Sequence, residues 1–89
     1  MKLRTIEELH DKHIGHKKFA KICDLLVEKG YKVENIKEYY EQFKFDVDGY
    51  WFTYSKDWKS SAKDFVDYLV NILNMKKLMA KEPNKVWRF

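Results

Sequence analysis

Cysteine is almost absent from this chain, and long apolar runs are absent altogether. Cys23 is the only cysteine, so no disulfide can form within the chain, and a reducing, cytoplasmic setting is the default expectation. No stretch approaches the ~20 apolar residues that a membrane span needs, and the N-terminal MKLRTIEELHDKH lacks the apolar core of a signal peptide. We therefore expect no membrane partner.

Arginine is also scarce, since Arg4 and Arg88 stand beside 16 lysines. Residues 1–73 hold 13 basic and 13 acidic residues, whereas residues 74–89 hold five basic residues against Glu82 alone. The whole net charge of +4 therefore lies in the last sixteen residues. We treat the chain as a single domain, 1–89, with a basic, apolar C-terminal tail at 74–89.

Motifs of catalysis are missing too. No glycine-rich phosphate loop, no pair of carboxylates in an apolar setting, and no serine or cysteine beside a recognisable base occurs. Cys23 falls on the apolar stripe of a predicted helix, where a cysteine is usually an inert small hydrophobe. We therefore expect a non-enzymatic protein without a cofactor.

The clearest structural signal is the run FKFDVDGYWFTY at residues 43–54. Asp48-Gly49 is a dipeptide that tolerates the positive φ angles of a two-residue type I′ turn. Before it, apolar residues alternate with polar ones, as in a strand with one solvated face. In the run after the turn, both faces of the predicted strand are apolar enough to be at least partly covered. The pattern predicts a β-hairpin, which the rest of the chain must cover, because a lone hairpin is unstable in water.

Two helices are predicted before this hairpin. Thr5 and Glu8 fit a capping box that opens the first helix, which we expect to be interrupted near Gly15. The second spans His16 to Lys29, and Gly30 ends it with a left-handed cap. Its apolar stripe consists of Phe19, Ile22, Cys23 and Leu26.

Residues 32–42 allow two interpretations. Ile36, Tyr39, Tyr40 and Phe43 have helical spacing, but Tyr39 and Glu41 also continue the alternation of the following strand. We favour extended structure from about Lys37, because aromatic residues favour strands. An earlier short strand at residues 31–33 stays an alternative.

A long C-terminal helix is predicted after a turn at residues 55–57, with Asp57 or Ser60 as its cap. Lys76 falls in the middle of its apolar face, so we expect a bend or fraying near Asn74, and Pro83 ends any helix. The apolar face of this predicted helix comprises Trp58, Ala62, Phe65, Val66, Leu69, Ile72, Leu73 and Met79. We expect the apolar segment 86–89 to dock on the domain or on a second copy of it.

These elements predict a small α+β fold: N-terminal helices, an antiparallel hairpin or three-stranded meander, and a long C-terminal helix on one sheet face. From Phe19 to Leu73 the element order resembles the double-stranded-RNA-binding fold. The segment LVEKGYKVENIKEYYEQF, residues 26–43, is similar in layout to HicA-type toxin ribonucleases, which place a histidine on the sheet. No histidine follows His16 here, so that resemblance argues against activity, and we transfer no site residue.

Three histidines invite a metal-site interpretation. His10, His13 and His16 are spaced by three, and on one continuous helix they would spread over about 120°, so at most two would share a metal. Structural zinc sites usually take four ligands from two separated elements. We favour surface or half-buried histidines and assign no metal, although a metal site stays an alternative.

The hairpin region also holds an excess of aromatic residues. We expect half of these rings to be core and the rest to leave an exposed patch, which suits nucleobase stacking or a protein partner. The rings in question are those of Tyr39, Tyr40, Phe43, Phe45, Tyr50, Trp51, Phe52 and Tyr54.

The basic segments carry the functional hypothesis. Lysines among apolar residues contact phosphates, so we expect binding to nucleic acid or a nucleoprotein complex. The alternative is a protein-binding inhibitor or adaptor, of phage or other mobile-element origin, that is directed at a host protein; a homodimer also stays open. The candidate binding residues are Lys56, Lys59, Lys63, Lys76, Lys77, Lys81, Lys85, Trp87 and Arg88.

Overall fold

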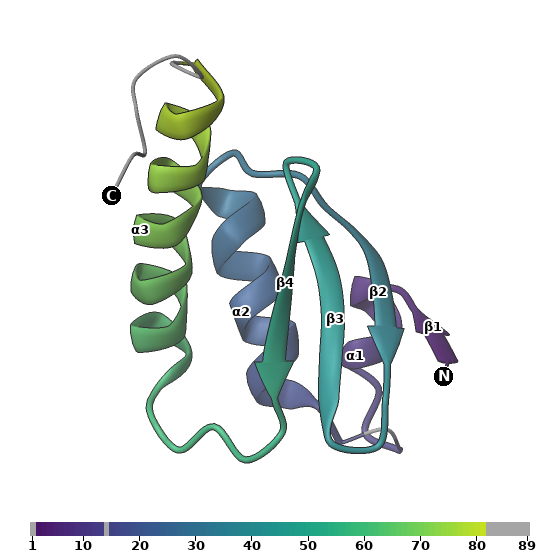
Figure 1. The fold of residues 1–89 in the computed structure, drawn as a ribbon. Helices are drawn as coiled ribbons and strands as arrows, with labels where there is room; N and C mark the ends of the chain where they lie inside the picture. Colours follow the sequence, from purple (N-terminus) through teal and green to yellow (C-terminus); the bar gives the residue numbers. More distant parts are fainter. Residues whose placement is uncertain (1, 14, 82–89) are drawn as a thin grey trace.

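The computed structural model describes residues 2–13 and 15–81, which form helices packed on an antiparallel sheet (Figure 1). This confirms the predicted α+β class with its long C-terminal helix. The elements are β1 (Lys2–Arg4), α1 (Ile6–Leu9), α2 (Lys17–Glu28), β2 (Val33–Glu38), β3 (Gln42–Val47), β4 (Tyr50–Ser55) and α3 (Ala62–Lys81).

The sheet has four strands in the order β1-β2-β3-β4, and α2 and α3 cover the same face of it (Figure 1). From α2 to α3 the chain follows the predicted helix, strands, helix order. The strand β1 adds to the two or three strands expected, because Leu3 pairs with Lys37 at the free edge of β2. Three residues are too few to show a period in sequence, so only the pairing reveals this strand.

The predicted hairpin is confirmed in detail. Asp48 has φ 51° and Gly49 has φ 87°, the two positive values of a type I′ turn. Phe45 pairs with Phe52 across β3 and β4, and both rings face the helices in the core. Trp51 points to the opposite, uncovered face, because neighbouring residues on a strand alternate between the two sides.

The segment before this hairpin differs from the prediction. Extended structure begins at Val33 rather than near Lys37, and the chain turns at residues 39–41. The N–H of Tyr39 donates to the carbonyl of Gln42 (2.8 Å) and closes that turn. The proposed alternation of Tyr39 and Glu41 with Phe43 along one strand is therefore wrong, because the chain must reverse here for β2 and β3 to pair antiparallel.

The helices α1 and α2 agree with the sequence patterns. The Thr5 hydroxyl accepts a hydrogen bond from the N–H of Glu8 (3.2 Å), as a capping box requires. At the end of α2, Gly30 has φ 92°, and the N–H of Tyr31 donates to the carbonyl of Leu26 (3.0 Å). All four residues of the predicted apolar stripe of α2 are buried.

The helix α3 begins and continues differently from the prediction. Ser61 caps it, since its hydroxyl accepts from the N–H of Asp64 (3.2 Å). Neither Asp57 nor Ser60 is the cap: Asp57 belongs to the preceding turn, where its N–H donates to the Ser55 hydroxyl. The expected bend near Asn74 is also absent, and one helix continues to Lys81.

The placement of Lys76 explains why α3 stays regular. Its ammonium lies 5.9 Å from the Trp51 ring centre and 5.7 Å from that of Phe52, so the charge meets aromatic faces instead of an aliphatic core. The last turns of α3 pass beyond the hairpin (Figure 1), so Met79, predicted on the buried face, is exposed. Pro83 and the expected docking of segment 86–89 lie outside the described residues.

Aromatic rings join the two layers. Phe19 of α2 stacks on Phe43 of β3 (4.4 Å between ring centres) and on Tyr54 of β4 (5.1 Å). Phe65 of α3 meets Tyr54 edge-on at 5.0 Å. Leu69, one turn further along α3, is fully buried. No described helix is both long and apolar enough to cross a membrane.

Candidate anion-binding site at the lysine end

The helices α2 and α3 both begin at one end of the molecule, next to the β2–β3 turn and the loop after β4 (Figure 1). The N–H of Lys56, in that loop, donates to the carbonyl of Glu41 in the turn (3.0 Å). The Lys18 ammonium, in the first turn of α2, donates to the carbonyls of Trp58 and Ser60 (both 3.1 Å). These bonds bring three separate segments together.

Lysines from three segments gather here, and we call this surface the lysine end. Its members are Lys17, Lys18 and Lys21 of α2, Lys56 and Lys59 of the loop, and Lys63 of α3. All except Lys56 are exposed. The first turn of α2 contains no acidic residue, and that of α3 contains Asp64. Helix N-termini carry partial positive charge, so two of them reinforce the lysines.

Glu38, at the end of β2, organises the charges beneath this surface. Its carboxylate accepts hydrogen bonds from Arg4 Nε (2.7 Å) and Lys56 Nζ (2.9 Å), and it pairs with His16 Nε2 at 3.0 Å. Burial alone would raise the pKa of Glu38, but these three partners outweigh burial and lower the pKa to about 2. Glu38 is therefore a carboxylate at neutral pH, and two fixed cations offset its charge.

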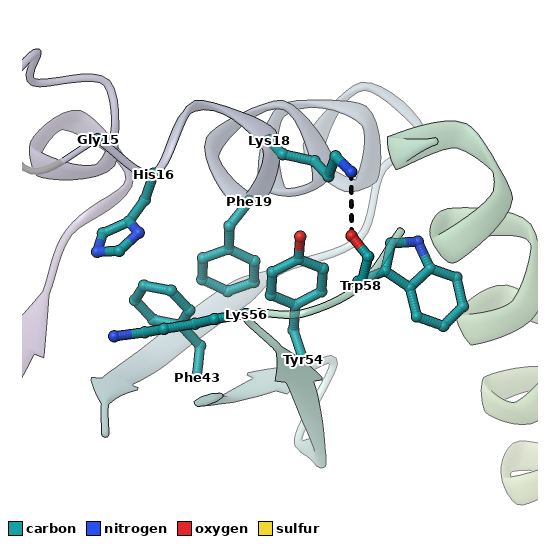
Figure 2. Close-up of a pocket in the computed structure, with 8 residues that line it drawn as sticks. All are labelled: Gly15, His16, Lys18, Phe19, Phe43, Tyr54, Lys56 and Trp58. Atoms are coloured by element: carbon teal, nitrogen blue, oxygen red, sulfur yellow. Dashed lines mark hydrogen bonds between the residues drawn. The ribbon is translucent and has the colours of Figure 1, made fainter. Parts of the chain in front are cut away.

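A hollow of about 140 Å³ opens between α2, β4 and the loop (Figure 2). His16 and Lys56 lie on one side of it, and Lys18 and Trp58 lie on the other. The floor carries the Tyr54 hydroxyl. Tyr54 as a whole is only 4% exposed, but its hydroxyl makes no hydrogen bond among the described residues and is open to the hollow. Burial raises the pKa of Tyr54, so this hydroxyl stays protonated and able to donate. The lining residues are Gly15, His16, Lys18, Phe19, Phe43, Tyr54, Lys56 and Trp58.

The predicted lysines divide between the two ends of α3. Lys76 and Lys77 lie 13 residues or more beyond Lys63, about 20 Å along the helix. Lys77 donates to Asp48 (2.7 Å), and this bond raises the pKa of Lys77. It also lies 5.2 Å from the ring centre of Tyr31. Lys56, Lys76 and Lys77 therefore have partners within the fold, whereas Lys59 and Lys63 are exposed.

Four of the predicted binding residues lie at or beyond the limit of the described chain. Lys81 is the last residue of α3. Lys85, Trp87 and Arg88 lie outside the described residues, so their part in binding stays a prediction.

Half of the predicted aromatic cluster is core, as expected: Phe43, Phe45, Phe52 and Tyr54 are buried. The exposed rings form two separate groups. Tyr39 and Tyr40 lie in the β2–β3 turn at the lysine end, and 93% of Tyr40 is exposed. Trp51 lies on the uncovered sheet face with the Lys44 ammonium 5.0 Å from its ring centre.

Two of the three histidines take carboxylate partners. His10 Nε2 lies 2.9 Å from Asp24, His16 pairs with Glu38, and His13 is exposed. Within residues 2–13 and 15–81, no group of three or more metal-ligating side chains comes together. Cys23 is buried, and burial, with a smaller effect of Asp24, raises the pKa of its thiol to about 12. That thiol is therefore a packed apolar group at neutral pH.

Sequence reasoning missed the hollow and the group around Glu38. Arg4, His16, Glu38 and Lys56 are far apart in the chain, and no spacing connects them. The cluster Lys17-Lys18-Lys21 at the start of a predicted helix was the one available signal, because a helix N-terminus with three lysines favours anions.

Comparisons of this chain with protein-family models, with curated proteins and with solved structures found no match.

Proposed function

We propose that this chain is a small non-enzymatic protein that binds nucleic acid, alone or in a nucleoprotein complex, through the lysine end. The observation that carries the proposal is that the N-termini of α2 and α3 and the loop after β4, which together hold six lysines, lie at one end of the molecule (Figure 1). Phosphate contacts from lysines and helix N-termini supply most sequence-independent binding to nucleic acids.

The surroundings favour the same function. The Glu38 carboxylate lies below the surface and is neutralised by Arg4 and Lys56, so it repels phosphates little. Exposed Tyr39 and Tyr40 border the lysines and offer ring faces to an unpaired base or a sugar. The predicted basic tail would add contacts from Lys81, Lys85 and Arg88. A cytoplasmic location, expected from the lone cysteine, belongs to this proposal.

The test is a salt titration of binding with a charge-removing variant. Fluorescence anisotropy is measured with labelled duplex and single-stranded RNA and DNA from ~50 mM salt upward, where phosphate contacts are strongest. We expect Lys59→Gln with Lys63→Gln to weaken binding about tenfold at the lowest salt. The slope of log K against log salt should fall by about one for each phosphate contact removed.

The matched control changes two exposed lysines at the opposite end of α2, Lys29→Gln with Lys32→Gln. It removes the same charge and should leave binding nearly unchanged. Equal weakening by both double variants would show only a general charge effect. Undetectable binding to all four nucleic acids at ~50 mM salt would overturn the proposal.

A protein partner is the second candidate, and the uncovered sheet face supports it. Leu3 and Trp51 are exposed there (67% and 58%), and β4 is an edge strand without a charged residue. Such surfaces suit an inhibitor or adaptor of mobile-element origin that binds a host protein. Capture from a nuclease-treated bacterial lysate that is lost with Trp51→Ser, and kept with Lys59→Gln and Lys63→Gln, would favour this role.

A further inference from the structure

The hollow in Figure 2 has the chemistry of a small anion site rather than of a gap in packing. Hydrogen-bond donors border it on two sides, with His16 and the Lys56 ammonium opposite the Lys18 ammonium. No acidic residue lines it, and Glu38 lies behind His16 and Lys56, bound to both. An anion entering the hollow would therefore meet donors first.

The start of α2 adds backbone donors. The first intrahelical bond runs from the N–H of Ala20 to the carbonyl of His16 (2.9 Å), so the N–H groups of residues 17–19 have no partner within the helix. The side chain of His16, the N-cap residue, makes no capping hydrogen bond. The start of α2 therefore lacks a side-chain cap, and His16, Lys18 and Phe19 from this turn line the hollow.

Tyr54 is the independent observation that points to a ligand. Its ring is buried between Phe19 and Phe65, which fixes the hydroxyl in place. Figure 2 shows this hydroxyl pointing toward α2, between Phe19 and the Lys18–Trp58 bond. No side-chain nitrogen or oxygen of the described residues is fully buried without a partner, so this hydroxyl is open to the hollow, where it can donate to a bound acceptor.

Size and shape restrict the ligand. A volume of about 140 Å³ exceeds what one water needs, so the hollow has room for a tetrahedral oxyanion. A phosphodiester within a strand continues on both sides, whereas a terminal phosphate enters such a hollow end-on. It also carries nearly two negative charges at neutral pH.

We infer that the hollow bounded by His16, Lys18, Tyr54 and Lys56 binds a terminal phosphate monoester of a nucleic-acid strand. This inference rests on the proposed function and makes it more specific, because the lysine end then recognises strand ends as well as the backbone. The phosphate oxygens accept from the Tyr54 hydroxyl and from the open N–H groups of α2, between the ammonium groups of Lys18 and Lys56.

The test compares three forms of one short oligonucleotide: 5′-phosphorylated, 3′-phosphorylated and unphosphorylated. Inorganic phosphate is titrated separately. Affinities come from anisotropy, and amide chemical shifts locate the contact. We expect at least one phosphorylated form to bind about tenfold tighter than the unphosphorylated form, and inorganic phosphate to shift the amides of residues 17–19.

Tyr54→Phe is the decisive variant, because it removes the hydroxyl and keeps the ring in the core. It should abolish the preference for the phosphorylated end and leave the affinity for the unphosphorylated form unchanged. Lys29→Gln is the control and should keep the preference. A melting temperature within a few degrees of the wild type shows that each variant is folded.

The outcomes separate this inference from the proposed function. Equal affinity for all three forms, with backbone binding intact, overturns the terminal-phosphate site alone. No binding of any oligonucleotide, with inorganic phosphate still shifting residues 17–19, overturns both the proposed function and the nucleic-acid source and identifies a free-anion site. A preference that survives Tyr54→Phe overturns the assignment to this hollow.

Discussion

At the scale of single residues, Glu38 has the largest influence on the lysine end. Its carboxylate holds Arg4, His16 and Lys56, which come from β1, from the start of α2 and from the loop after β4. The three contacts span the chain and orient two of the groups that border the hollow. A change of this one side chain should therefore alter both stability and its dependence on pH.

Glu38→Gln gives the first prediction. The lowered pKa of Glu38, about 2, means that its contribution to stability is fully present above its ordinary pKa of 4.5 and is lost as the pH falls toward 2. We expect the variant to lose about 1–2 kcal/mol of unfolding free energy at pH 7, and much less at pH 3. Urea unfolding at the two pH values measures this.

Glu34→Gln is the control on the same strand, because Glu34 is exposed and its contact with Lys32 is long, at 3.8 Å. It should change stability little at either pH. A Glu38→Gln effect of the same size at pH 7 and pH 3 would mean that the carboxylate charge is not what stabilises this group.

At the scale of elements, α3 depends on one buried face. Phe65 and Leu69 lie against the sheet, whereas Asn71 and Asn74 face solvent. The ends of the helix make polar contacts, since Ser61 supplies the N-terminal cap and Lys77 reaches the hairpin turn. Packing in the middle of α3 therefore holds it on the sheet.

The second prediction concerns the buried face of α3. Leu69→Ala or Phe65→Ala should lower the free energy of unfolding by roughly 2–5 kcal/mol, because each leaves a cavity in a small core. Asn71→Ala, on the solvent side of the same helix, should have an effect near zero. Chemical denaturation measures all three, and an unchanged midpoint for Leu69→Ala would show that the helix packs through a different face.

At the scale of the whole molecule, charge is separated along α3. The lysine end lies at its start, and the predicted basic tail follows its end, with Lys76 and Lys77 engaged in between. We expect the basic tail to contribute to both stability and nucleic-acid binding.

The third prediction is a truncation after Pro83. Burying Trp87 and Phe89 could contribute several kcal/mol by area, so we expect the shortened chain to melt at a lower temperature. The loss of Lys85 and Arg88 should also weaken nucleic-acid binding and reduce its salt dependence. Calorimetry and anisotropy measure the two effects, and sedimentation of the full chain tests a homodimer.

Two full-length variants separate the rings from the charges. Phe89→Ser should lower the melting temperature only, and Lys85→Gln with Arg88→Gln should weaken binding only. A truncation that weakens binding without lowering the melting temperature would identify the tail as a free arm. If neither the melting temperature nor the binding changes, the tail contributes to neither stability nor nucleic-acid binding. The protein-partner function then becomes the stronger candidate.

Much of the fold was predictable because its signals are local. The turn at Asp48-Gly49, the end of α2 at Gly30 and the cap at Thr5 each depend on a few adjacent residues. The candidate site was less predictable. Lys59 and Lys63 were identified from the sequence, whereas the partners that occupy Lys56 and Lys77 come from residues 18 and 29 positions away.

The sequence by itself determined the elements that backbone preference and hydrophobic period specify: the type I′ hairpin, the two amphipathic helices and the α+β class. Only the tertiary structure decided that β1 joins the sheet, that residues 39–41 turn, and that Glu38 gathers Arg4, His16 and Lys56. The physical reason is that local preferences act within a few residues, whereas strand neighbours, ion pairs and hollows depend on contacts between distant parts of the chain. Charge along the sequence therefore indicated a basic tail, and the folded chain added a lysine end that no single segment contains.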